Sequence, residues 1–202
     1  MNEPIEFYLE FVSPFAYIAA KEIEKVGAKH GREVIWRPIS LGHIWKVLGV
    51  VGPASVPQKL NYIMMDSARS AKLLGIPIAK PAVFPVDAKL ARLVFYALNK
   101  TDKALAKKFA EGVCDLFWGQ GKQITMPEHL INLARSLGLD LEYLARAAED
   151  QEAKAAMIEA TKAAVESGAV GMPWFKVDDQ VYWGADRISQ IDQYLENSAA
   201  NG

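Results

Sequence analysis

The fold is decided by the stretch Ile5-Glu6-Phe7-Tyr8-Leu9-Glu10-Phe11-Val12-Ser13-Pro14-Phe15-Ala16-Tyr17, in which a β-strand runs directly into an α-helix. From Phe7 to Phe11, apolar residues alternate with polar or amphipathic ones, a pattern typical of a sheet strand. Ser13 is then predicted to be the N-cap of a helix whose first residue is Pro14. A hydroxyl is therefore expected at the end of a strand and at the positive end of a helix, where an anion is favoured.

The composition describes a globular chain with a substantial core. The 202 residues are 51% hydrophobic, and 23 basic against 24 acidic residues give a formal net charge of −1. This balance excludes the polycationic signature of a nucleic-acid-binding protein. The chain starts Met-Asn-Glu-Pro without a signal pattern, and no apolar run approaches the ~18 residues of a membrane helix. We therefore expect a soluble cytoplasmic protein with no membrane partner.

The cysteine and histidine residues argue against disulfide, redox and metal chemistry. Cys114 is the single cysteine, so an internal disulfide and any CxxC redox or zinc motif are excluded. It lies in a helical run of apolar residues, which predicts a buried structural thiol. His30, His43 and His129 have no metal-ligand spacing, so no metal is expected.

The order of predicted elements is βαβ, a long helical block, then ββα. Further strands are predicted at 33–38, ended by Pro38, and in a hairpin of 173–177 and 180–183 around Asp178-Asp179. This order predicts an α/β protein with a thioredoxin-like domain interrupted by a large all-helical insertion. The discontinuous domain would comprise 1–86 and 168–202, and the insertion 87–167.

Smaller features complete this prediction. Residues 39–56 are expected to be irregular because they hold three glycines and Pro53, and a helix is expected at 57–74. A capping box at 125–128 would start a helix over 126–137. The last helix is predicted at 186–195, followed by a frayed tail at 197–202.

Chemistry is expected where Ser13 meets Pro173. In thioredoxin-like folds the start of the first helix faces a proline, usually in cis, at the start of the hairpin. A cis Met172–Pro173 bond would expose the backbone N–H and C=O of Met172 to a peptide-like ligand. The alternative is that Pro173 only begins a strand.

Ser13 stands where a redox member of this fold would carry a cysteine. A hydroxyl cannot form a disulfide, but it can donate a hydrogen bond to a thiolate that a ligand brings. Lowering a thiol pKa from ~8.5 by ~2 units takes roughly 2.7 kcal/mol. A charged hydrogen bond together with a helix N-terminus can supply that amount. The alternative is that Ser13 only caps the helix.

Motifs along nearly the whole chain resemble one family. They are the opening stretch, the Gly52-Pro53 loop, Gln58-Lys59-Leu60-Asn61-Tyr62, Gly75-Ile76-Pro77, Gly171-Met172-Pro173-Trp174 and Trp183-Gly184-Ala185-Asp186-Arg187. Together they are similar to 2-hydroxychromene-2-carboxylate isomerases, relatives of kappa-class glutathione transferases and DsbA-like proteins. The resemblance implies a homodimer that uses glutathione as cofactor. Its small aromatic carboxylate substrate would be 2-hydroxychromene-2-carboxylate or a related catabolite, isomerised to trans-o-hydroxybenzylidenepyruvate by reversible thiolate addition.

The resemblance also implies roles for individual residues. Ser13 would be catalytic through the glutathione sulfur, Met172 would bind the tripeptide backbone, and Asp186 would take the γ-glutamyl ammonium group. The full set implied for glutathione is Ser13, Pro14, Phe15, Lys59, Met172, Pro173, Trp183, Gly184, Ala185 and Asp186. Trp45, Lys46 and Phe84 could hold the substrate, with Lys46 pairing its carboxylate.

Departures and alternatives stay open at this point. Val50 and Ala185 stand where the family often has polar residues, and Phe84 stands where the isomerase has tyrosine. A kappa-like glutathione transferase shares the same sulfur site, and a non-catalytic thioredoxin-fold binding module is a third reading. Packing or solvent exposure alone could explain Trp45, Lys46, Lys59 and Phe84, and helix capping could explain Asp186.

Overall fold

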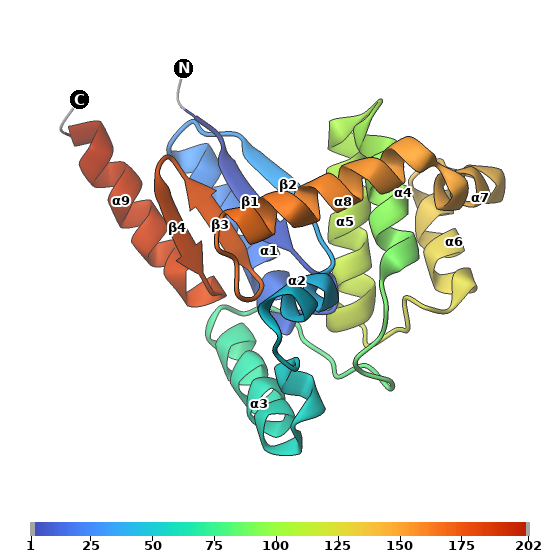
Figure 1. The fold of residues 1–202 in the computed structure, drawn as a ribbon, viewed down its shortest axis with the longest axis horizontal. Helices are drawn as coiled ribbons and strands as arrows, with labels where there is room; N and C mark the ends of the chain where they lie inside the picture. The colour runs from blue at the N-terminus through green and yellow to red at the C-terminus, as the bar shows by residue number, and fades with distance from the viewer. Residues whose placement is uncertain (1–2, 201–202) are drawn as a thin grey trace.

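A mixed four-stranded sheet forms the centre of the computed structural model, which describes residues 3–200 (Figure 1). Its strands are β1 (Ile5–Leu9), β2 (Val34–Pro38), β3 (Trp174–Val177) and β4 (Gln180–Trp183). The strand order is β2-β1-β3-β4. The β1 strand pairs parallel to β2 and antiparallel to β3, and β3 and β4 form an antiparallel hairpin. The predicted βαβ…ββα topology of a thioredoxin-like domain is confirmed.

Helices cover both faces of the sheet. Figure 1 shows α1 (Pro14–Lys29) behind the strands and α8 (Gln151–Glu166) in front of them. The final helix, α9 (Ile188–Ala200), packs beside α1. Lys29 and His30 at the end of α1 both pair with Asp192 of α9, at 2.9 and 2.7 Å. These pairs fix the last helix to the first across most of the chain length.

An all-helical insertion lies beside the sheet. It holds α4 (Lys89–Asn99), α5 (Lys103–Cys114), a π-helical turn η2 (Asp115–Gly119), α6 (Pro127–Ser136), α7 (Leu141–Glu149) and α8. Figure 1 places α4 to α7 together on one side of the molecule, with α8 leading back to the sheet. Asp140 caps α7, accepting from the Tyr143 N–H at 2.6 Å. The predicted fold class, with its large helical insertion, is therefore confirmed.

The prediction that 39–56 is irregular is wrong. This segment contains α2 (Leu41–Leu48) and a short 3₁₀ turn, η1 (Pro53–Ser55), ahead of α3 (Pro57–Leu73). Leu41 and Ile44 bury one side of α2, and Gly49 ends the helix in the left-handed conformation (φ 67°). The prediction fails because it takes Gly49 as a helix breaker, whereas Gly49 is the C-terminal cap of a helix.

Two further predictions about helix ends are wrong. The α6 helix begins after Met126 without any side-chain capping bond, so the capping box at 125–128 does not form. Pro127 at the first helical position starts this helix instead, because its fixed φ suits a helix and its missing N–H is not needed there. The expected frayed tail is helical as far as Ala200, and the last two residues of that prediction lie outside the described residues.

Aromatic packing holds the sheet together at its centre. The Phe7 ring stacks on Phe175 of β3 at 5.2 Å and meets Trp36 of β2 edge-on at 5.1 Å. All three residues are buried. No helix within residues 3–200 is long and apolar enough to span a lipid bilayer.

Candidate functional site

Ser13 caps the first helix as predicted. Its backbone is extended (φ −88°, ψ 119°), and its hydroxyl accepts a 3.2 Å hydrogen bond from the Ala16 N–H. The Tyr17 N–H donates to the Ser13 carbonyl at 3.1 Å. The Phe15 N–H has no acceptor among residues 3–200 and is available at the positive end of the helix.

The structure brings Ser13 and the hairpin proline together. The Met172–Pro173 peptide bond is cis, as predicted. The Ser13 hydroxyl donates a 2.9 Å hydrogen bond to the Met172 carbonyl, although the two residues are 159 positions apart. Both are nearly buried, at 7% and 5% exposed. Met172 also carries a backbone N–H that no other group in the described part of the chain accepts.

The predicted role of Ser13 requires its hydroxyl to change hydrogen-bond acceptor. A serine hydroxyl has a single proton, and here that proton is already given to the Met172 carbonyl. To stabilise a thiolate, the hydroxyl must exchange this neutral acceptor for an anionic one. Hydrogen bonds to an anion are roughly twice as strong as neutral ones, which favours the exchange when a thiolate is present.

The hairpin end forms a second wall of the site. The Trp183 indole lies directly over Gly171, where an added Cβ would come 2.7 Å from the indole Nε1. The Gly184 N–H donates to the Pro173 carbonyl at 3.0 Å. These contacts place the segment from Trp183 onward beside the cis-proline. Trp183 remains 56% exposed, so this wall faces solvent.

Asp186 projects from this wall into solvent. Its side chain is 71% exposed and lies 3.3 Å from the Arg187 guanidinium group. The reading of Asp186 as a helix N-cap is wrong, because Gly184 (φ 113°) occupies that position and Asp186 lies inside the 3₁₀ turn η3 (Ala185–Arg187). The Gly184 conformation makes any residue with a Cβ strained there, and the exposed Asp186 carboxylate would have to turn away from it.

The other predicted site residues make different contacts. Trp45 packs its ring on Gly52, while Lys46 and Lys59 are exposed. In the described part of the chain, neither lysine forms a hydrogen bond or ion pair with Ser13, Met172 or Asp186. Phe84 packs edge-on against Trp118 at 5.5 Å, and its bond to Pro85 is also cis, which was not predicted.

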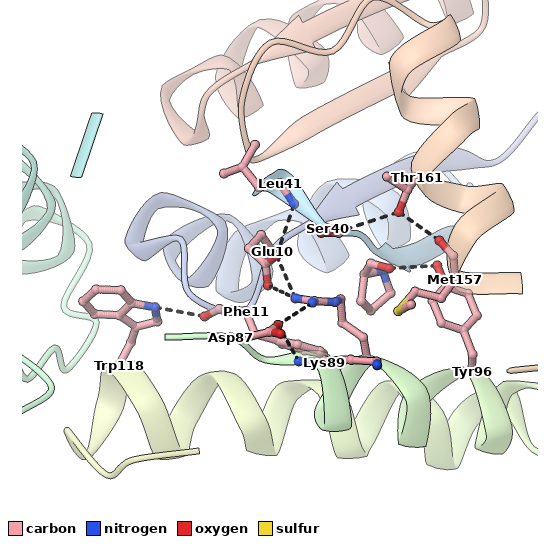
Figure 2. A network of polar contacts seen from close by, with 12 residues as sticks. Glu10, Phe11, Ser40, Leu41, Asp87, Lys89, Tyr96, Trp118, Met157 and Thr161 are labelled. Atoms are coloured by element: carbon pink, nitrogen blue, oxygen red, sulfur yellow. Dashed lines mark hydrogen bonds and ion pairs between the residues drawn. The ribbon is translucent and has the colours of Figure 1, made fainter. Parts of the chain in front are cut away.

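The sequence did not predict a buried polar network around Glu10, three residues before Ser13. Both carboxylate oxygens of Glu10 lie 2.8 Å from one Arg92 nitrogen, and the Leu41 N–H donates to the same carboxylate at 3.2 Å (Figure 2). A second Arg92 nitrogen bonds Asp87 at 2.7 Å. Burial raises the pKa of the Glu10 carboxyl, which Arg92 and the Leu41 N–H oppose. The signal in the sequence is an acidic residue directly after the strand, between the apolar Leu9 and Phe11.

Trp118 and Cys114 complete the surroundings of the site. The buried Trp118 indole N–H donates to the Phe11 carbonyl at 3.1 Å. Cys114 is fully buried as predicted, and desolvation raises its thiol pKa far above the usual range. Two surface hollows of about 370 and 560 Å³ flank the η2 turn, and Ser13 lines neither of them.

Comparisons with known proteins show the family and the overall fold. Residues 4–196 match the family model described as DSBA-like thioredoxin domain. A 2-hydroxychromene-2-carboxylate isomerase of Sphingobium xenophagum is 29% identical over 198 residues, covering 96% of this chain and 99% of the relative. Glutathione S-transferase kappa 1 of Caenorhabditis elegans is 26% identical, with 95% and 90% covered. A solved 2-hydroxychromene-2-carboxylate isomerase superposes with a TM-score of 0.85 at 26% identity, covering 98% and 96%.

Proposed function

We propose that this chain, which belongs to the DSBA-like thioredoxin domain family, is a glutathione-dependent isomerase like the relatives it resembles. Its substrate would be 2-hydroxychromene-2-carboxylate, converted to trans-o-hydroxybenzylidenepyruvate, or a related small aromatic carboxylate. The observation that carries this proposal is the juxtaposition of the Ser13 hydroxyl with the backbone of Met172 at a cis-proline. Near-full-length similarity to isomerases and a kappa-class transferase supports an enzymatic role.

The residues present fit a glutathione molecule. A peptide ligand needs backbone partners, and the Met172 N–H is a donor that no group within residues 3–200 uses. A thiolate needs donors at a helix start, which the Ser13 hydroxyl and the Phe15 N–H can provide. An ammonium group needs a carboxylate, and Asp186 offers one at the surface.

The remaining predicted contacts complete this proposal. Pro14, Pro173, Gly184 and Ala185 would contact the tripeptide through their backbone, Trp183 would cover one side of it, and Lys59 would pair one of its carboxylates. When bound, glutathione supplies the thiolate that adds reversibly to the unsaturated substrate. Trp45 and Phe84 would hold the aromatic ring of that substrate, with Lys46 pairing its carboxylate.

In the proposed mechanism, Ser13 acts as a hydrogen-bond donor. Its proton turns from the Met172 carbonyl to the incoming sulfur, and the Phe15 N–H and the helix dipole stabilise the same charge. Ser13 itself never becomes the nucleophile. Because Ser13 is 7% exposed, water competes weakly for these donors.

A kappa-like transferase is the second candidate, favoured by the relative from Caenorhabditis elegans. It would use the same sulfur site on electrophiles. The product separates the two, because a transferase yields a stable conjugate whereas an isomerase regenerates glutathione. A non-catalytic binding module would turn over neither substrate. A homodimer and a cytoplasmic location are also proposed.

Ser13→Ala is the decisive variant. It removes a charged hydrogen bond, so we expect the pKa of the bound thiol to rise by about 1–2 units and turnover to fall by about 10- to 100-fold. Ultraviolet thiolate absorbance of the glutathione complex and a steady-state isomerase assay measure the two quantities.

The matched control is Asp140→Ala, which removes a capping bond from α7, a helix remote from Ser13 in the chain. Both variants should lose about 0.5–2 kcal/mol of stability. Only Ser13→Ala should change the thiol pKa. An unaltered pKa and full turnover in Ser13→Ala would exclude the proposed role. A glutathione co-crystal whose sulfur lies away from Ser13 would exclude it as well.

A further inference from the structure

The helical insertion holds the ends of the two parallel strands through four hydrogen-bonded contacts (Figure 2). After β1, Trp118 donates to the Phe11 carbonyl at 3.1 Å and Arg92 donates to the Glu10 carboxylate at 2.8 Å. After β2, the contacts are the Tyr96 hydroxyl to the Pro38 carbonyl at 3.0 Å and the Ser40 N–H to the Thr161 hydroxyl at 3.3 Å. Ligand sites in open α/β sheets lie at this carboxyl edge.

The two contacts after β1 converge on the four-residue turn 10–13. The turn is closed by the Ser13 N–H, which donates to the Glu10 carbonyl at 2.8 Å. Its position is then set by Arg92 at Glu10 and by Trp118 at Phe11. Ser13 is thus the last residue of a turn that the insertion holds at its first two residues.

We propose that Trp118 and Arg92 are positioning residues for Ser13. This inference rests on the proposed function, since it concerns the same sulfur site. Neither side chain bonds Ser13. Trp118 and Arg92 fix the turn so that the Ser13 hydroxyl can reach both the Met172 carbonyl and a bound thiolate. The insertion therefore contributes to the site although every residue implied for glutathione or for the substrate lies in 1–86 or 168–202.

Trp118 is held tightly enough for this role. Its backbone carbonyl accepts the Ala79 N–H at 2.6 Å, and its ring packs against Phe117 at 5.2 Å and Phe84 at 5.5 Å. The side chain is 1% exposed. Because the indole is held on several sides, its hydrogen bond fixes the 10–13 turn relative to η2. The same indole packs against Phe84, a proposed substrate contact.

Arg92 uses its two terminal nitrogens on different carboxylates, Glu10 and Asp87. Its Nε is buried without a hydrogen-bond partner in the described part of the chain. Lysine carries the same charge on a single nitrogen and cannot hold the two carboxylates in this fork. Arg92→Lys therefore tests the geometry while it keeps the charge.

The experiment compares Trp118→Phe with Tyr96→Phe. Each removes one donor from a buried aromatic side chain to a strand-end carbonyl, but only Trp118 bonds the turn that carries Ser13. We expect Trp118→Phe to lower kcat about tenfold, with KM for the substrate changed less than about twofold. The pKa of bound glutathione, read from thiolate absorbance, should rise in this variant. Tyr96→Phe should change neither quantity.

Arg92→Lys is the second variant, for the case in which Trp118→Phe does not fold. It should show the same fall in kcat and the same rise in thiol pKa. A folded Trp118→Phe or Arg92→Lys that matches Tyr96→Phe in both readouts would overturn the inference. If Ser13→Ala reduces turnover in that case, the proposed function stands and only the positioning role fails. If Ser13→Ala has no effect, the proposed function itself fails.

Discussion

At the scale of single residues, Gly171 decides whether Trp183 can lie against the cis-proline. A Cβ at this position would come within 2.7–3.0 Å of three indole atoms, closer than real Cβ contacts allow. Gly171→Ala should displace the indole and weaken glutathione binding about tenfold. Isothermal titration calorimetry measures the affinity, and tryptophan fluorescence reports the displaced ring.

Gly42→Ala is the matched control for that substitution. An added Cβ at Gly42, in the first turn of α2, meets no atom within 4 Å. This variant should bind glutathione normally and gain about 0.4–1 kcal/mol of stability, because alanine loses less backbone entropy on folding. Equal glutathione affinities of the two alanine variants would show that the position of the Trp183 ring does not affect ligand binding.

Sequence reasoning succeeded for residues whose roles are local. Ser13 caps a helix and Pro173 follows a Gly-Met pair at a hairpin, and both patterns are visible within a few positions. Glu10 could be recognised as unusual but not paired, because its partner Arg92 lies 82 positions away. Nothing in a sequence gives the distance between two such side chains before the fold is known.

At the scale of elements, the β3–β4 hairpin depends on Asp178. This residue adopts a left-handed backbone (φ 54°), as two-residue hairpin turns require, and its carboxylate pairs with Arg32. Hydrogen bonds from Arg32 hold the pKa of Asp178 below its ordinary value. The hairpin is thereby tied to the segment between α1 and β2.

This pKa shift gives a pH dependence with a definite sign. Because the folded-state pKa is lowered, the stabilisation is present above the unfolded value of about 3.9 and is lost as the pH falls through the folded value. Urea denaturation at pH values from about 6 down to about 2 should show this loss. Asp178→Asn keeps a residue that tolerates positive φ and should be less stable than the parent at neutral pH. The gap between them should close in acid, and a constant gap would contradict the assignment.

The α2 helix shows why element prediction failed where glycines cluster. Gly42, Gly49 and Gly52 suggested a loop, yet Gly42 lies within the helix and Gly49 caps its end. Gly52 is required for a different reason: a Cβ at this position would collide with the Trp45 ring. The spacing of Leu41, Ile44, Trp45 and Leu48 carries the helical signal, which the three glycines outweighed although only Gly52 is required by a tertiary contact.

At the scale of the whole molecule, the buried pair of Glu10 and Arg92 joins the sheet domain to the insertion. Arg92→Met leaves the buried Glu10 carboxylate without its cation and should cost about 3–5 kcal/mol in the free energy of unfolding. The double variant Glu10→Met/Arg92→Met buries no uncompensated charge at Glu10 and should recover much of that loss. Chemical denaturation of both variants measures the difference, and an additive loss in the double variant would contradict this coupling.

The proposed organisation of the molecule can be tested at the same scale. The division into 1–86 with 168–202 and 87–167 stays a prediction, as does the homodimer. Hydrogen exchange followed through denaturation would show whether the insertion opens as a separate unit, and light scattering would give the oligomeric state. The fold class could be predicted because element order is local information, whereas these properties depend on surfaces that only the folded chain creates.

The hydrogen bond between Ser13 and Met172 has a consequence for folding of the chain during its synthesis on the ribosome. Its two partners are separated by 159 positions, and β1 becomes an interior strand only when β3 arrives. Synthesis starts at the N-terminus, so the first helix is made long before the strands that complete the candidate site. A nascent chain stalled before residue 172 would hold Ser13 without its acceptor. Under the proposed function, glutathione binding would therefore begin only after residue 172 has been synthesised.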